Sequence, residues 1–127
     1  MKAEKIYIIA QSYDGVSKSS YNRENFFKVL DIIDEDSLDE YGDFSTGFQD
    51  YTEKLFGEDS IEVEQLVYEL LFGCEEYCNT NTTLQQRIDA IKSGNYCAEN
   101  EEVTTAIGFN AKDAKANLIQ DEDDLDW

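Results

Sequence analysis

The chain has 127 residues and a formal net charge of −19, with 29 Asp and Glu against 10 Lys and Arg. A hydrophobic content of 41%, with 8 Tyr and 7 Phe, is too high for a disordered acidic polymer. We therefore expect one folded domain over residues 1–120 with an acidic tail over residues 121–127, and the charge argues against nucleic acid and anionic membrane surfaces as partners.

The first apolar segment is KIYIIA, at residues 5–10. A short apolar run of this kind is compatible with a buried strand or with the start of a helix. No other segment offers a clear partner strand, and the spacing of Ile6, Ile9 and Tyr13 fits one helical face. We therefore expect a helix here, with a strand as the alternative, and a loop in the serine-rich stretch that follows Gly15.

Two segments before residue 79 have the spacing of strong amphipathic helices. Asn22 is suited to cap the first, whose apolar positions are Phe26, Val29, Leu30 and Ile33. Asp59 and Glu62 begin the second, whose inward stripe comprises Val63, Leu66, Val67, Leu70, Leu71, Cys74 and Cys78. The acidic residues of the second helix are expected to stay in water: Glu58, Glu62, Glu69 and Glu76.

The segment between these two helices is interrupted by glycine. Ser37 and Glu40 form an S-x-x-E capping box, and apolar residues follow at helical intervals at Tyr41, Phe44, Phe48, Tyr51 and Leu55. Gly42 and Gly47 break the pattern, because glycine is a poor helix former. The sequence therefore allows one helix or two short ones, the second capped by Ser45.

The second half predicts three more short helices. The first is capped by Thr82 and Gln85, ends at Gly94 and carries Leu84, Ile88 and Ile91. Residues 95–100 are expected to be a connector, followed by a helix that ends at Gly108 and carries Val103, Ala106 and Ile107. Asn110 caps the last helix, with Ala111, Ala114 and Leu118 facing the core. In total we expect six or seven short helices in an all-α or mainly α domain.

Residues that usually carry catalysis or bind metal are few. The chain has no histidine, the commonest general base and metal ligand. The chain has three cysteines, Cys74, Cys78 and Cys97, which are too few ligands for a typical structural zinc site. The acidic runs that begin at Asp34 and Asp121 both fail the EF-hand pattern at its fifth position. We therefore expect no enzymatic activity, no cofactor and no specific metal site.

The sequence also indicates the cellular compartment in which the protein is expected. No apolar stretch approaches 18 residues, so no transmembrane helix is expected. The apolar run near the N-terminus is interrupted by Gln11 and Ser12 and lacks a convincing cleavage site, so we expect it to be part of the fold. An odd number of cysteines without disulfide-framework spacing favours a reducing cytoplasm.

The negative charge is concentrated in one part of the chain. Residues 31–78 hold 16 Asp or Glu and a single base, Lys54. Most charge runs are solvated helix faces, but such faces usually alternate acids with lysines. The imbalance, together with interleaved aromatic residues, favours a surface that binds a basic protein. The predicted partner surface comprises Asp34, Glu35, Asp36, Asp39, Glu40, Tyr41, Asp43, Phe44, Asp50, Tyr51 and Glu53, with Asp123, Asp124, Asp126 and Trp127 of the tail.

In overall character the chain resembles the immunity proteins of bacterial contact-dependent growth inhibition systems. The resemblance lies in small size, acidity, the segment DEDSLDEYGD at residues 34–43 and the tail DEDDLDW at residues 121–127. It implies a protein that binds a cognate basic toxin domain, such as a tRNase or DNase, and blocks its active site, in some complexes with a further host protein. The alternatives are a nucleic-acid mimic that inhibits restriction or CRISPR enzymes, and a regulatory or scaffold domain without inhibitory activity.

Overall fold

The computed structural model describes residues 4–34, 36–38, 43–72, 83–99 and 103–118. Within them the chain forms four strands: β1 (Lys5–Ser12), β2 (Gly15–Asn22), β3 (Tyr96–Glu99) and β4 (Val103–Gly108). The helices are α1 (Arg23–Asp31), α2 (Thr46–Phe56), α3 (Ser60–Leu71), α4 (Leu84–Lys92) and α5 (Ala111–Leu118), with the 3-10 turn η1 (Gly57–Asp59) between α2 and α3. No helix of these described segments is long and apolar enough to cross a membrane.

The strands form one antiparallel sheet in the order β2-β1-β4-β3, so the fold is α/β. The prediction of an all-α or mainly α domain is therefore wrong. The first and last parts of the chain meet in the centre of the sheet, where Tyr7 of β1 pairs with Gly108 of β4. Strands β2 and β3 are the two edges.

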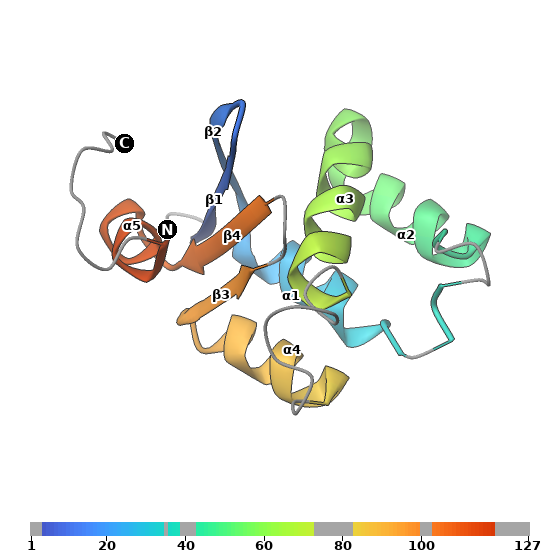
Figure 1. The fold of residues 1–127 in the computed structure, drawn as a ribbon. Coiled ribbons are helices and arrows are strands. Elements are labelled where there is room, and N and C mark those ends of the chain that lie inside the picture. The colour runs from blue at the N-terminus through green and yellow to red at the C-terminus, as the bar shows by residue number, and fades with distance from the viewer. Residues whose placement is uncertain (1–3, 35, 39–42, 73–82, 100–102, 119–127) are drawn as a thin grey trace.

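Helices cover both faces of the sheet (Figure 1). On one face, Ile6, Ile8 and Ile107 pack with the apolar stripes of α1 and α3 in the main core. On the other face α5 contacts β1 and β4, where Ile9, Ala106 and Ala114 are fully buried. The middle of the two central strands is therefore buried on both faces of the sheet, whereas the ends of β1 at Lys5, Gln11 and Ser12 are exposed.

Burial on both faces of the sheet explains why the sequence of residues 5–10 lacks the usual alternation of a strand and was assigned to a helix. Strands with one wet face alternate polar and apolar residues, whereas strands buried on both faces have continuous apolar runs. Ile6 and Ile8 face the main core and Ile9 faces α5, so all three are buried although they lie on opposite faces. The helix preferred from the sequence is wrong, and the strand alternative is what the structure shows.

The partner strands were missed for different reasons. The predicted loop after Gly15 is β2, an exposed edge strand whose residues show little apolar alternation. The predicted connector at residues 95–100 contains β3, and the predicted helix ending at Gly108 is β4. In β4 the β-branched Val103, Thr104, Thr105 and Ile107 were a strand signal.

The helix predictions hold elsewhere because local caps define the helix starts. The side-chain oxygens of Asn22, Ser45 and Asn110 accept hydrogen bonds from backbone N–H groups at the starts of α1, α2 and α5. The stripe of α3 is buried from Val63 to Leu71, whereas Cys74 and Cys78 lie outside the described residues. In α4 the capping box is formed by Thr83 with Gln86, one residue after the predicted pair.

Of the two short helices that the sequence allows after Ser37, the described residues contain only the second. Ser37 lies in a turn, where its Oγ accepts a hydrogen bond from the backbone N–H of Asp34 at 3.0 Å. Leu38 then forms an isolated antiparallel bridge with Phe44, and the backbone N–H of Ser45 donates to the carbonyl of Ser37 at 2.9 Å. A continuous helix from Ser37 is therefore wrong, and the helix capped by Ser45 is confirmed as α2.

Candidate functional site

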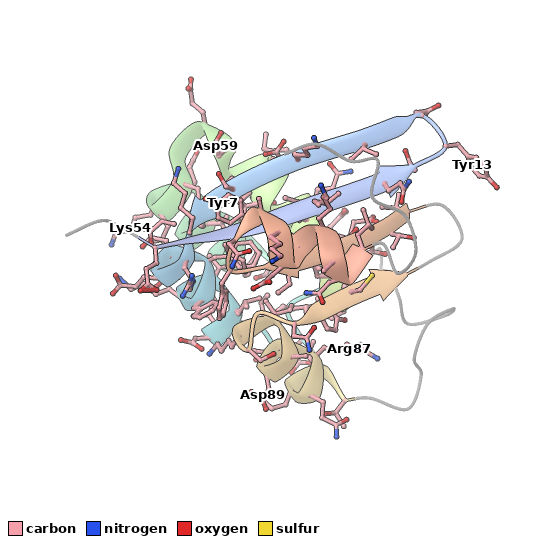
Figure 2. The ribbon with its side chains drawn as sticks, turned by 90° about the vertical axis from the view of Figure 1, so that its left-hand side faces the viewer. Tyr7, Tyr13, Lys54, Asp59, Arg87 and Asp89 are labelled. Carbon is pink, nitrogen blue, oxygen red and sulfur yellow. The ribbon has the colours of Figure 1, made fainter. Side chains whose placement is uncertain are left out.

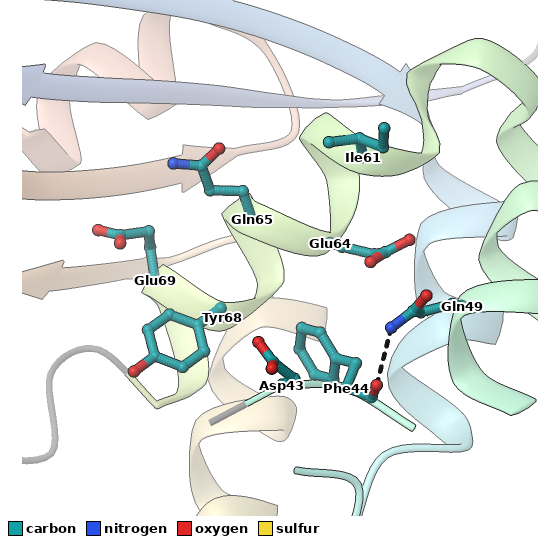
Figure 3. Close-up of a pocket in the computed structure, with 8 residues that line it drawn as sticks. All are labelled: Asp43, Phe44, Gln49, Ile61, Glu64, Gln65, Tyr68 and Glu69. Atoms are coloured by element: carbon teal, nitrogen blue, oxygen red, sulfur yellow. Dashed lines mark hydrogen bonds between the residues drawn. The ribbon is translucent and has the colours of Figure 1, made fainter. Parts of the chain in front are cut away.

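An acidic hollow on the described surface lies between α3 and the segment that leads into α2 (Figure 3). We call it the α3 trough. It has a volume of about 400 Å³ and is lined by Asp43, Phe44, Gln49, Ile61, Glu64, Gln65, Tyr68 and Glu69. None of these lining residues is a lysine or arginine, so the charged groups of the lining are all carboxylates.

The floor of the trough is fixed by packing around Phe44. The Phe44 ring stacks on Phe48 with centroids 4.3 Å apart and meets the edge of Phe72 at 6.2 Å. The side-chain amide of Gln49 donates a hydrogen bond to the Phe44 carbonyl at 2.8 Å (Figure 3). These contacts fix the shape of the trough, and a preformed site lowers the entropy cost of binding.

The wall formed by α3 combines apolar and acidic side chains. Ile61 is 76% exposed, although it is a large aliphatic residue, and Tyr68 lies two helical turns further along the same face. Glu64 and Gln65 lie between them. An exposed apolar residue beside carboxylates is typical of a protein-binding site, in which the apolar group is buried on contact and the acids select a basic partner.

Glu64 is a carboxylate of the trough with a shifted pKa. Partial burial, and secondarily the negative charge of Glu53 on α2, raise the pKa of Glu64 above its ordinary value of 4.5. Both effects oppose the charged form of this carboxylate. A cation placed in the trough would counteract both.

The raised pKa of Glu64 predicts how the stability of the folded protein depends on pH. The folded state favours protonated Glu64. The stability that this side chain contributes is therefore present at low pH and is lost as the pH rises through its raised pKa. Glu64→Gln should therefore raise the melting temperature at pH 7, by about 1–3 °C for a largely hydrated group, and have no effect near pH 3. Thermal denaturation at both pH values checks this. A gain of equal size at both would contradict it.

A second hollow lies on the other side of α3, against the β1–β2 hairpin. Its lining includes Ala10, Ser17, Ser19 and Glu62, and it shares Gln65 and Glu69 with the α3 trough. Glu62 accepts hydrogen bonds from the hydroxyls of Ser19 and Tyr21. Carboxylates therefore lie on both flanks of α3, and no lysine or arginine lines this hollow either.

The residues of the predicted partner surface occupy several places. Asp43 and Phe44 line the α3 trough. Asp50, Tyr51 and Glu53 lie on α2, where Glu53 is close enough to affect Glu64. Asp34 and Asp36 belong to the turn after α1, and the Asp34 carboxylate accepts the Asp36 backbone N–H at 2.8 Å. Eight residues lie outside the described part of the chain: Glu35, Asp39, Glu40, Tyr41, Asp123, Asp124, Asp126 and Trp127.

Sequence reasoning missed the contribution of α3 to the trough. It assigned Glu62 and Glu69 to an ordinary wet face and gave no role to Ile61, Glu64, Gln65 or Tyr68. A signal was present, because Ile61 and Tyr68 lie seven residues apart and outside the buried stripe. Apolar residues that recur on the polar face of an amphipathic helix indicate a second contact surface.

The described residues do not indicate metal chemistry. They contain no group of three or more His, Cys, Asp or Glu side chains placed to hold a metal ion. Cys97 is exposed on β3.

Fold and site together define a broad class: a small antiparallel α/β domain that carries an acidic groove with one exposed apolar residue, Ile61. No family model matches the chain, and no curated protein or solved structure shows significant similarity to it.

Proposed function

We propose that this protein is an inhibitor of the immunity class, which binds a basic toxin domain, in particular a nuclease such as a tRNase or DNase, and occludes its substrate-binding surface. One observation carries the proposal: the α3 trough joins carboxylates to the exposed side chain of Ile61 and the half-buried ring of Tyr68 without a lysine or arginine in its lining. A nuclease groove has the complementary character, since it must hold phosphates with basic side chains.

Binding would proceed by long-range attraction followed by local desolvation. A net charge of −19 attracts a basic surface at a distance and raises the association rate. Once the surfaces meet, burial of Ile61 and Tyr68 slows dissociation. The trough carboxylates then take the positions that substrate phosphates would occupy, so inhibition follows from occlusion alone.

Glu64 gives this binding a characteristic pH dependence. A lysine or arginine of the toxin beside Glu64 favours the charged form of this carboxylate. The pKa of Glu64 is therefore lower in the complex than in the free protein. Affinity should therefore rise as the pH increases through the raised pKa of Glu64. In this proposal the complex forms in the cytoplasm, and a further host protein can join it.

The proposal is tested by co-expression with the product of the neighbouring gene. We expect a basic domain that co-purifies with this protein at 150 mM salt and whose cleavage of tRNA or DNA stops when the two are mixed in equal amounts. Failure to form a complex, or cleavage that continues in the complex, would contradict the proposal. Displacement of DNA from restriction or CRISPR enzymes, with no effect on the neighbouring product, would favour a nucleic-acid mimic.

A further inference from the structure

The outer edge of β2 is open in the described structure. β2 is eight residues long and forms one end of the sheet order, so the described residues place no strand beside it. Figure 2 shows the β1–β2 hairpin running out to its tip, where Tyr13 is 97% exposed. An edge of this length is a template on which another chain can add a strand.

The pairing register shows which backbone groups face outward. The backbone N–H of Arg23 donates to the carbonyl of Glu4 at 2.9 Å, so this pair is a hydrogen-bonded one. Hydrogen-bonded pairs alternate along an antiparallel ladder, and the register therefore makes Tyr21, Ser19 and Ser17 the next residues that bond to β1. The N–H and C=O groups of the intervening Val16, Lys18 and Ser20 point away from β1.

The usual protection of an edge strand is largely missing from β2. The chain has no proline, and the register of β2 with β1 runs from Asn22 to Gly15 without a bulge. Lys18 is the single charged residue of the strand. Natural edges of this length are normally interrupted by proline, bulges or several charges, because they otherwise recruit other strands.

We propose that the edge of β2 takes an extended segment of a basic partner protein as a fifth strand, bonded to the backbone of Val16, Lys18 and Ser20. This deepens the proposed function, on which it rests for the existence of a basic partner. Addition of a strand to a sheet edge derives affinity from backbone hydrogen bonds and specificity from alternate side chains.

The charges on the two faces of β2 select the side chains of that segment. Ser19 and Tyr21 point to the α3 side, where both donate to the Glu62 carboxylate. Lys18 points to the opposite side. The added strand should therefore carry lysine or arginine at alternate positions, on the side of Glu62, and uncharged residues between them.

The same charges argue against a second copy of this chain as the occupant. Two molecules with a net charge of −19 repel each other, and pairing of two β2 edges would bring their Glu62 side chains towards one another. Basic side chains instead neutralise Glu62. The partner surface would then extend from the α3 trough across the second hollow to the hairpin, because the two hollows share Gln65 and Glu69.

The test uses an eight-residue peptide of alternating lysine and threonine, and a matched peptide of alternating glutamate and threonine. We expect the lysine peptide to bind and to slow hydrogen exchange at the backbone amides of Val16, Lys18 and Ser20 in the wild-type protein. Ser20→Pro removes one outward N–H without a loss from the β1–β2 ladder, and should weaken binding by up to about tenfold, as expected for one lost hydrogen bond. Ser20→Ala, its control, should bind as the wild type does.

Several outcomes would overturn the inference about β2. These are no binding of the lysine peptide, equal binding of the glutamate peptide, or binding that leaves exchange at Val16, Lys18 and Ser20 unchanged. The exchange measurement needs no variant, so it decides the matter even if Ser20→Pro fails to fold. A dimer in sedimentation that Ser20→Pro dissociates would identify a second copy as the occupant. None of these results affects binding of a toxin in the α3 trough, which is measured separately.

Discussion

Gly108→Ala is expected to lower the free energy of unfolding by about 2–3 kcal/mol, because it forces a methyl group into a closed contact. Gly108 lies at the end of β4, directly beneath α5. A Cβ atom there would overlap the backbone nitrogen of Ala114 and lie 2.8 Å from the carbonyl carbon of Asp113. These are backbone atoms, so relief requires α5 to move away from the sheet and expose Ile9 and Ala106.

Gly47→Ala is the matched control. Gly47 lies in the first turn of α2, and a Cβ atom there would meet nothing within 4 Å. The same chemical change should therefore leave stability unchanged or raise it by about 0.5 kcal/mol, because alanine favours the helix. Urea denaturation of both variants provides the comparison. Equal stabilities for the two would contradict the close packing of α5 on β4.

Charge reversal beside the trough is expected to have the largest effect on binding. Glu53→Lys combined with Glu64→Lys places two cations where the proposed toxin presents its own. The association rate constant with the co-purifying basic domain should fall by about 10- to 100-fold at low salt, because steering by opposite charges is replaced by local repulsion. Its dependence on salt should also become weaker. Stopped-flow measurements between 20 and 300 mM salt check both effects.

The control carries the same change in net charge at a distance from the trough. Glu24→Lys with Asp89→Lys reverses two exposed acids, on α1 and α4, that line neither hollow. We expect its association rate constant to fall by less than about threefold, since overall charge changes while the local field of the trough does not. If both double variants slow association equally, net charge alone attracts the partner and the trough has no special role.

The helices were predictable because their signals are local. Asn22, Ser45 and Asn110 cap the next few residues, and the stripe from Val63 to Leu71 repeats within a single element. Strands depend on distant partners, and here those partners carry weak patterns. β1 is buried on both faces, and β2 is an exposed edge rich in serine. Neither strand therefore alternates polar and apolar residues in the usual way.

The site was predictable only in part for a similar reason. Asp43 and Phe44 could be identified because acidic and aromatic residues interleave in that segment. Glu64 and Tyr68 are separated from them by the whole of α2, and only the packing of α2 against α3 brings them together. The raised pKa of Glu64 likewise depends on Glu53, which lies on a different helix.

The most direct test of the α3 trough is an NMR titration of the Glu64 side-chain carboxyl, in the free protein and in the complex with the basic domain. In the free protein its pKa should lie above 4.5. In the complex the pKa of Glu64 should fall well below its value in the free protein. A cation of the partner stabilises the negative charge of Glu64, which burial and Glu53 disfavour in the free protein. A Glu64 pKa that is unchanged or higher in the complex would show that no cation enters the trough and would contradict the proposed mode of binding.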